Sequence, residues 1–146
     1  MRTDVTKPLK LEVIEQLPWL FADLHFRIVD DGYDPDAFGN SWVTVVCSTF
    51  LARFVRDRGQ IWIEVASKTA PKNWWAFENV LAPCRKEWGD VYDSVIQPAD
   101  ILRRELDTLT EGLGTKFLKT RSELSQADRE RKRVFMAAAR SPRDDR

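Results

Sequence analysis

Residues 41–66, SWVTVVCSTFLARFVRDRGQIWIEVA, decide the fold. Apolar and polar side chains alternate along 50–55 and 61–66, as they do in β-strands. Residues 41–48 are apolar at nearly every position, which is typical of a strand in the middle of a sheet. Residues 56–60 connect the last two segments and contain Gly59, which can adopt the left-handed conformation of a tight hairpin with a bulge. We therefore predict three strands, the last two of which form a hairpin.

Two further elements precede these strands. Apolar residues recur at helical offsets from Leu9 to Leu17, with charged residues between them, so we predict an amphipathic helix that ends before Pro18. From residue 24 to residue 29 the period changes to two, which predicts a first strand. Residues 30–40 are rich in Asp, Gly and Pro, and we expect them to form an acidic loop.

Helical spacings return after residue 66. We predict helices over 72–81 and 100–113 and a shorter one around 86–95. Residues 125–133 are almost wholly polar and predict a solvated helix, which begins with a capping-box-like pair at Ser125 and Asp128. Residues 141–146 have no apolar anchor, and we expect them to be disordered.

The order of these elements predicts an α+β fold. An N-terminal helix is followed by a four-stranded antiparallel β-meander and then by C-terminal helices packed on one face of the sheet. The strand connections are too short for parallel crossovers. A chain of 146 residues fits one such domain. We expect residues 1–118 to form that domain and residues 119–146 to form a polar tail that is helical or partly disordered.

Composition argues against several classes of function. The 23 basic residues equal the 23 acidic ones, whereas a general polyanion-binding protein carries a basic excess. The chain has no apolar run long enough to span a membrane and no secretory leader, so we expect a cytoplasmic protein. Cys47 and Cys84 lack the short spacing of a zinc site, and the six glycines form no phosphate-binding loop. We therefore expect no cofactor.

Most of the six tryptophans and eight phenylalanines fall at positions that predict a core. Trp42, Phe50, Phe54 and Trp62 lie on the alternating strands. On the predicted helix over 72–81, the neighbours Trp74 and Trp75 point about 100° apart, so one of them should lie at the edge of the core.

A catalytic site of the Cys/His type would have to use His25, because it is the only histidine. Cys47 is the candidate nucleophile, and Asp23 or Asp57 would orient the imidazole. A structural imidazole and a small buried thiol are the commoner outcomes for such residues, so we expect a protein that is not an enzyme. A small-molecule-binding protein or a Cys/His enzyme, with a pocket between the sheet and the helices, is the alternative.

The acidic loop is the first candidate binding segment. It contributes Asp31, Asp34 and Asp36, whose carboxylates are ligands that calcium accepts. The glycine and the distal glutamate of an EF-hand loop are missing from the required register, so we expect no metal site. The loop instead offers a negative recognition surface.

The hairpin tip is the second candidate binding segment. It contributes Arg56, Asp57 and Arg58, which can pair with one another across the tip. The two arginines can also hold a carboxylate or phosphate in two-pronged fashion. A charged tip on a rigid sheet is a plausible recognition element.

The C-terminal basic run, Arg129–Arg133, offers a different partner. Basic helices can contact nucleic acid, but Asp128 and Glu130 dilute the charge here. No aromatic residues interleave with the run as they do in base-stacking platforms. We keep nucleic-acid contact through this helix as a further alternative.

The segments Phe38–Asn40 and Arg53–Gln60, with the following strand and the tryptophan pair, resemble a group of short uncharacterised bacterial proteins. Their pattern joins an FGN turn to an RFVRDRGQ hairpin, and the resemblance covers roughly residues 9–82. Some proteins of this build are encoded beside bacterial toxins and resemble immunity proteins, which implies a protein partner. The resemblance assigns no role to any residue. We therefore expect a non-enzymatic protein-binding domain, in its most specific form a toxin-neutralising immunity protein. An exposed edge strand would also allow a homo-oligomer.

Overall fold

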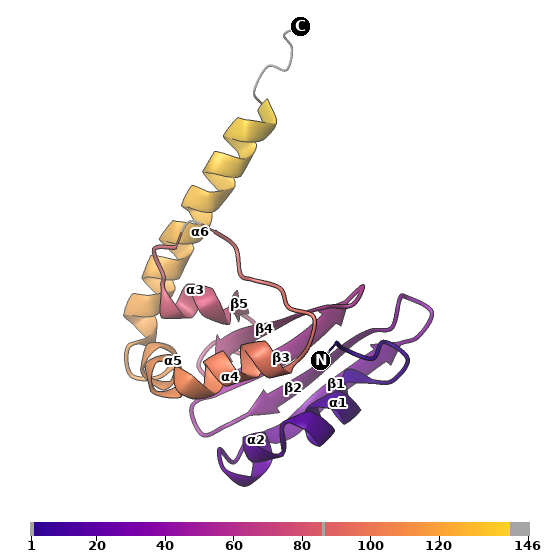
Figure 1. Ribbon diagram of the computed structural model, residues 1–146. Coiled ribbons are helices and arrows are strands. Elements are labelled where there is room, and N and C mark those ends of the chain that lie inside the picture. The colour runs from indigo at the N-terminus through magenta and orange to yellow at the C-terminus, as the bar shows by residue number, and fades with distance from the viewer. Residues whose placement is uncertain (1, 86, 141–146) are drawn as a thin grey trace, which may run out of the picture.

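A meander of antiparallel strands forms the centre of the structure, a computed structural model that describes residues 2–85 and 87–140 (Figure 1). The strands follow one another across the sheet in the order β1-β2-β3-β4-β5. Their bounds are β1 Arg27–Asp34, β2 Asn40–Val46, β3 Phe50–Asp57, β4 Gln60–Ser67 and β5 Trp75–Ala76. The predicted α+β class is confirmed, but the described part of the chain has five strands instead of four.

The β3–β4 hairpin is tighter than predicted. The two strands pair without a register shift from Phe50 opposite Ser67 to Asp57 opposite Gln60, so the turn consists of two residues and has no bulge. These residues, Arg58 and Gly59, have φ angles of 54° and 79°. Two consecutive positive φ angles are typical of the type I′ turn, whose twist matches that of the flanking strands.

The acidic stretch forms most of β1 instead of a loop. Asp31 and Asp34 lie within the strand, and only Asp36 lies in the turn that follows. β1 is one of the two edge strands, and its aspartates are exposed to solvent. Gly32 is required by packing here, since a Cβ would lie about 2.1 Å from the indole ring of Trp42.

The helices differ from the predicted ones mainly after the sheet. Their bounds are α1 Leu9–Gln16, α2 Pro18–Ala22, α3 Phe77–Leu81, α4 Ile96–Arg104, α5 Leu106–Leu113 and α6 Phe117–Arg140. Pro18 ends α1 as predicted and then begins α2, at the position where a missing N–H has no cost.

Four predicted helices need correction. The helix over 100–113 is two helices, because α4 begins at Ile96 and ends at Arg104, and α5 starts after Glu105. The helix over 72–81 is reduced to α3, because Trp75 and Ala76 pair with β4 as β5. Residues 87–95 form no helix, and Tyr92 instead pairs with Ile61 of β4. The solvated helix does not start at Ser125 but is part of α6, while the end predicted as disordered, 141–146, lies outside the described residues.

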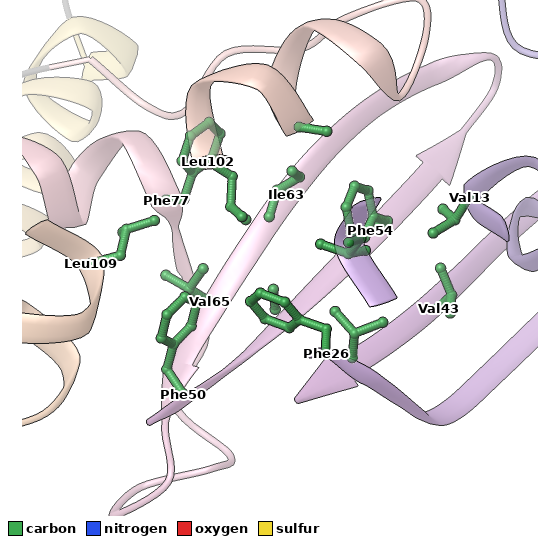
Figure 2. Close-up of a cluster of buried hydrophobic side chains, with 14 of the residues drawn as sticks. Val13, Phe26, Val43, Phe50, Phe54, Ile63, Val65, Phe77, Leu102 and Leu109 are labelled. Atoms are coloured by element: carbon green, nitrogen blue, oxygen red, sulfur yellow. The ribbon is translucent and has the colours of Figure 1, made fainter. Parts of the chain in front are cut away.

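One face of the sheet carries the core. Val43, Phe54 and Ile63 are fully buried there and form one cluster with Val13 of α1 and Leu102 of α4 (Figure 2). Alternate strand positions point to the other face.

That other face includes a row formed by Trp42, Val55 and Trp62, which are exposed or half-buried. Phe50 and Phe54 are core residues as predicted, whereas the same prediction is wrong for Trp42 and Trp62.

The long helix α6 starts on the domain and projects away from it (Figure 1). Phe117, Thr120, Leu124 and Arg131 are buried, whereas residues 132–139 are exposed. The expected boundary between residues 118 and 119 therefore falls inside a helix whose first turns pack against the rest of the chain. Within the described ranges, no helix is both long enough and apolar enough to cross a lipid bilayer.

Candidate functional site

Two strand turns and the N-terminal segment meet at one end of the sheet. They line a shallow cleft of about 760 Å³, which we call the turn surface and which consists of Val5, Thr6, Tyr33, Pro35, Phe38, Gly39, Arg58 and Gly59. The backbone N–H of Arg58 donates to Oδ1 of Asn40 at 2.9 Å, which joins the β3–β4 turn to the start of β2. The hydroxyl of Tyr33 donates to the carbonyl of Val5 at 3.3 Å. The turn surface is therefore held together by hydrogen bonds between its three segments.

Phe38 and Arg58 are the most exposed large side chains of this surface. Phe38 is 66% exposed and has a φ of 59°, a region that bulky residues rarely adopt. Arg58 is also in this region, with a φ of 54°, and its guanidinium carbon lies 5.3 Å from the centroid of the Phe38 ring. At this distance the cation is attracted to the face of the ring. Two residues in an unfavourable backbone conformation thus present an aromatic ring and a guanidinium together.

Gly39 fixes the turn against the N-terminal segment. Its φ is 69°, and a Cβ at this position would lie 2.2 Å from the carbonyl oxygen of Val5. No side chain can occupy that space without moving the backbone. The glycine therefore allows the close approach that forms one wall of the turn surface.

Arg56 does not reach the turn surface, although we predicted it at an exposed tip. It lies on the core face of β3, is 1% exposed, and its Nε donates to the carbonyl of Gly39 at 3.0 Å. Its terminal nitrogens donate to the carbonyls of Asp4 and Lys7 at 2.9 and 2.6 Å. Burial lowers the pKa of this guanidinium, and the Glu12 carboxylate, 3.5 Å away, opposes that effect. The prediction that Arg56 holds a ligand together with Arg58 is wrong, because its donors already bind the N-terminal segment.

The predicted acidic residues lie at different distances from this surface. Asp34 and Asp36 flank Pro35, one of its lining residues, and Oδ1 of Asp34 accepts from the N–H of Asp36 at 3.1 Å. Asp57 is half-buried and directly precedes Arg58. Asp31 lies further along β1, where its carboxylate is 3.9 Å from Nζ of Lys10. Three of the predicted aspartates are thus chain neighbours of residues that line the turn surface, but none of the four lines it, and the fourth lies near Lys10 of α1.

Two charged side chains of the N-terminal segment, Asp4 and Lys7, form hydrogen bonds with nearby residues. Hydrogen bonds from the side chain and the backbone of Thr6 lower the pKa of Asp4. The carboxylate of Glu15 accepts from Lys7 and raises the pKa of that ammonium. Both groups are therefore stabilised in their charged forms.

The catalytic candidates are not joined to each other. His25 is exposed, has a φ of 59° and lies in the turn before β1. Cys47 is half-buried, and its thiol donates to the carbonyl of Phe50 at 3.6 Å. Neither side chain lines the turn surface, and between residues 2 and 140, Lys86 apart, no three His, Cys, Asp or Glu side chains converge as metal ligands.

The basic run of α6 is largely engaged by its own helix. Arg131 is 5% exposed, and Lys132 lies 3.2 Å from the carboxylate of Asp128. Arg133 donates to Glu130 from both its Nε and a terminal nitrogen. The alternating acids therefore neutralise part of the run, as the sequence predicted.

Sequence reasoning missed Phe38 and Tyr33 as components of the site. The Phe38-Gly39-Asn40 turn was visible as a motif, but nothing in its composition shows that the phenylalanine faces solvent. The signal that could have found it is the glycine that follows, which indicates an irregular backbone where an aromatic residue has no strand or helix to bury it.

Comparisons with protein-family models, curated proteins and solved structures found no match for this chain.

Proposed function

We propose that this chain is a non-enzymatic domain that binds another protein through the turn surface. The observation that carries this proposal is Phe38, which is exposed at positive φ beside Arg58. Such a backbone conformation costs about 1–3 kcal/mol, and the exposed ring recovers little of it by burial. An arrangement that weakens the isolated fold is expected where the side chain serves recognition. Aromatic residues and arginines are also the residue types that dominate protein interfaces.

The surroundings of Phe38 define the chemistry of the partner. The ring suits an apolar pocket, and Arg58 suits a carboxylate at the rim of that pocket. Asp34 and Asp36 are exposed on either side of the lining residue Pro35 in the chain and suit basic side chains on the partner. A bacterial toxin is the partner that the resemblance implies, and its neutralisation is the corresponding role.

Co-expression of the tagged chain with the product of the neighbouring gene tests the proposal. We expect the two proteins to purify together, and we expect Phe38→Ala and Arg58→Ala each to weaken the measured Kd by at least about tenfold. The matched control is Phe135→Ala, since Phe135 is a similarly exposed phenylalanine on α6, and it should leave the Kd unchanged.

Thermal unfolding of each variant separates lost binding from lost folding. The proposal fails if the partner is not retained by the unaltered chain. It also fails if folded Phe38→Ala and Arg58→Ala bind the partner as well as the Phe135→Ala control does.

A further inference from the structure

A second cleft lies where the edge of β4 faces α6, apart from the turn surface. Its volume is about 420 Å³, which is within the range of small-molecule sites. Four tryptophans line it, namely Trp62 of β4, Trp74 just before β5, Trp75 of β5 and Trp88 of the loop before Tyr92. We call this site the tryptophan cleft.

The charged side chains in the wall of the tryptophan cleft already have partners of opposite charge, since the lining cation, Arg131, lies 3.8 Å from the carboxylate of Asp128. Each of its three carboxylates lies near a cationic side chain, in the pairs Glu64–Arg53 at 3.5 Å, Asp90–Arg85 at 2.9 Å and Asp128–Lys132 at 3.2 Å. A charged ligand of either sign would compete with one of these pairs. The wall therefore favours a neutral ligand.

Three buried polar atoms of residues in the same wall have no hydrogen-bond partner among residues 2–85 and 87–140. They are the donors Nε1 of Trp75 and Nε of Arg131 and the acceptor Oδ1 of Asn79. Asn79 and Arg131 are only 4% and 5% exposed, and an unpaired buried polar group is unfavourable. A ligand that satisfies all three must both donate and accept. Hydroxyl groups do both, whereas an ammonium group only donates and a hydrocarbon does neither.

Two of the tryptophan rings are fixed by arginines. The guanidinium carbon of Arg53 lies 3.9 Å from the Trp74 ring centroid, and that of Arg131 lies 4.8 Å from the Trp88 ring centroid. Trp88 still keeps 51% of its surface exposed. The C–H groups of a sugar ring carry partial positive charge and suit the negative face of such a ring.

We propose that the tryptophan cleft is a binding site for a neutral carbohydrate. A sugar ring stacks on the exposed part of Trp88, and its hydroxyl groups bond to Trp75, Asn79 and Arg131 when the side chains that cover these buried atoms move apart. This site is separate from the turn surface and does not depend on a protein partner.

Titration of the full chain with cellotetraose, maltotetraose and chitotetraose tests this proposal by calorimetry and tryptophan fluorescence. We expect at least one of these saccharides to bind. We also expect Trp88→Ala to weaken binding at least about tenfold and Trp75→Phe, which keeps an aromatic ring but removes the N–H, to weaken it by about threefold to tenfold. The control is Trp42→Ala, which removes an exposed indole outside the cleft and should leave affinity unchanged.

Three results would overturn the proposal. The first is the absence of binding for all three saccharides up to about 10 mM. The second is saccharide binding that folded Trp88→Ala retains in full. The third is binding of tetramethylammonium at the cleft in preference to the saccharides, which would assign it to a cation.

Discussion

A fully buried arginine fastens the N-terminal segment to the sheet. The guanidinium of Arg56 donates to the carbonyls of Gly39, Asp4 and Lys7, and its charge faces the buried carboxylate of Glu12. Arg56→Met leaves these acceptors unpaired and Glu12 without a cation. We expect the free energy of unfolding, measured in urea, to fall by about 3–5 kcal/mol.

The control for this substitution is Arg27→Met, at an exposed arginine of β1. It should change the free energy of unfolding by no more than about 0.5 kcal/mol. Equal losses in the two variants would contradict the assigned role of Arg56, and would mean that its desolvation offsets its hydrogen bonds.

The position of Arg56 shows where sequence reasoning stops at the scale of single residues. Its parity with Phe50, Ala52 and Phe54 places it on the core face once β3 is known to extend to Asp57. A charged residue in a run of charged residues just before a glycine, as Arg56 is, is however typical of a loop. Its partners on the N-terminal segment lie 49 to 53 positions earlier in the chain, so no local pattern reveals them.

At the scale of elements, the β3–β4 hairpin can be tested through its turn. Asparagine tolerates positive φ better than alanine does, and Asn-Gly is the preferred pair of a type I′ turn. Arg58→Asn and Arg58→Ala both remove the guanidinium above Phe38, so that loss cancels between them. We expect the free energy of unfolding of Arg58→Asn to exceed that of Arg58→Ala by about 1 kcal/mol, which corresponds to about 2–4 °C in Tm for a domain of this size.

Thermal denaturation of the two variants side by side provides the measurement. Identical melting temperatures would argue that residue 58 does not need a left-handed backbone in solution. A higher Tm for Arg58→Ala would contradict the type I′ turn outright.

The elements that the sequence predicted well are those whose signals are local. The apolar run of β2, the alternation in β3 and β4 and the glycine of the hairpin all lie within residues 41–66, which cover all but the first residue of β2 and the last of β4. β5 is different, because Trp75 and Ala76 are extended only through pairing with Val65 and Glu64 at the edge of β4. The aspartates of β1 similarly take strand conformation because β2 pairs with them. Tertiary pairing overrides local propensity in both cases.

At the scale of the whole molecule, the meander creates both proposed sites. The β1–β2 and β3–β4 turns meet at the turn surface. The last long strand, β4, leaves an edge beside which β5, the Tyr92 segment and α6 form the tryptophan cleft. Of the predicted binding residues, Arg58 lines the turn surface, whereas the aspartates do not. Nothing in the sequence indicated the tryptophan cleft, because Trp62 was assigned to the core and Trp88 to no position.

The outer part of α6 should be dispensable for folding, whereas its first part should not. A chain that ends after Arg133 loses Val134, Phe135 and Met136, which are 57%, 65% and 46% exposed, and keeps every side chain that is buried in the described part of the molecule. We expect its free energy of unfolding to stay within about 0.5 kcal/mol of that of the full chain.

A chain that ends after Leu118 also loses the buried Thr120, Leu124 and Arg131. Its free energy of unfolding should be lower than that of the full chain by at least about 3 kcal/mol, because one of the lost side chains, Leu124, belongs to the hydrophobic core. The free energies of unfolding of both truncations are measured in denaturant. Equal stability of the two chains would place the domain boundary at residue 118. A large loss of stability in the chain that ends after Arg133 would show that the exposed end of α6 packs on the domain in solution.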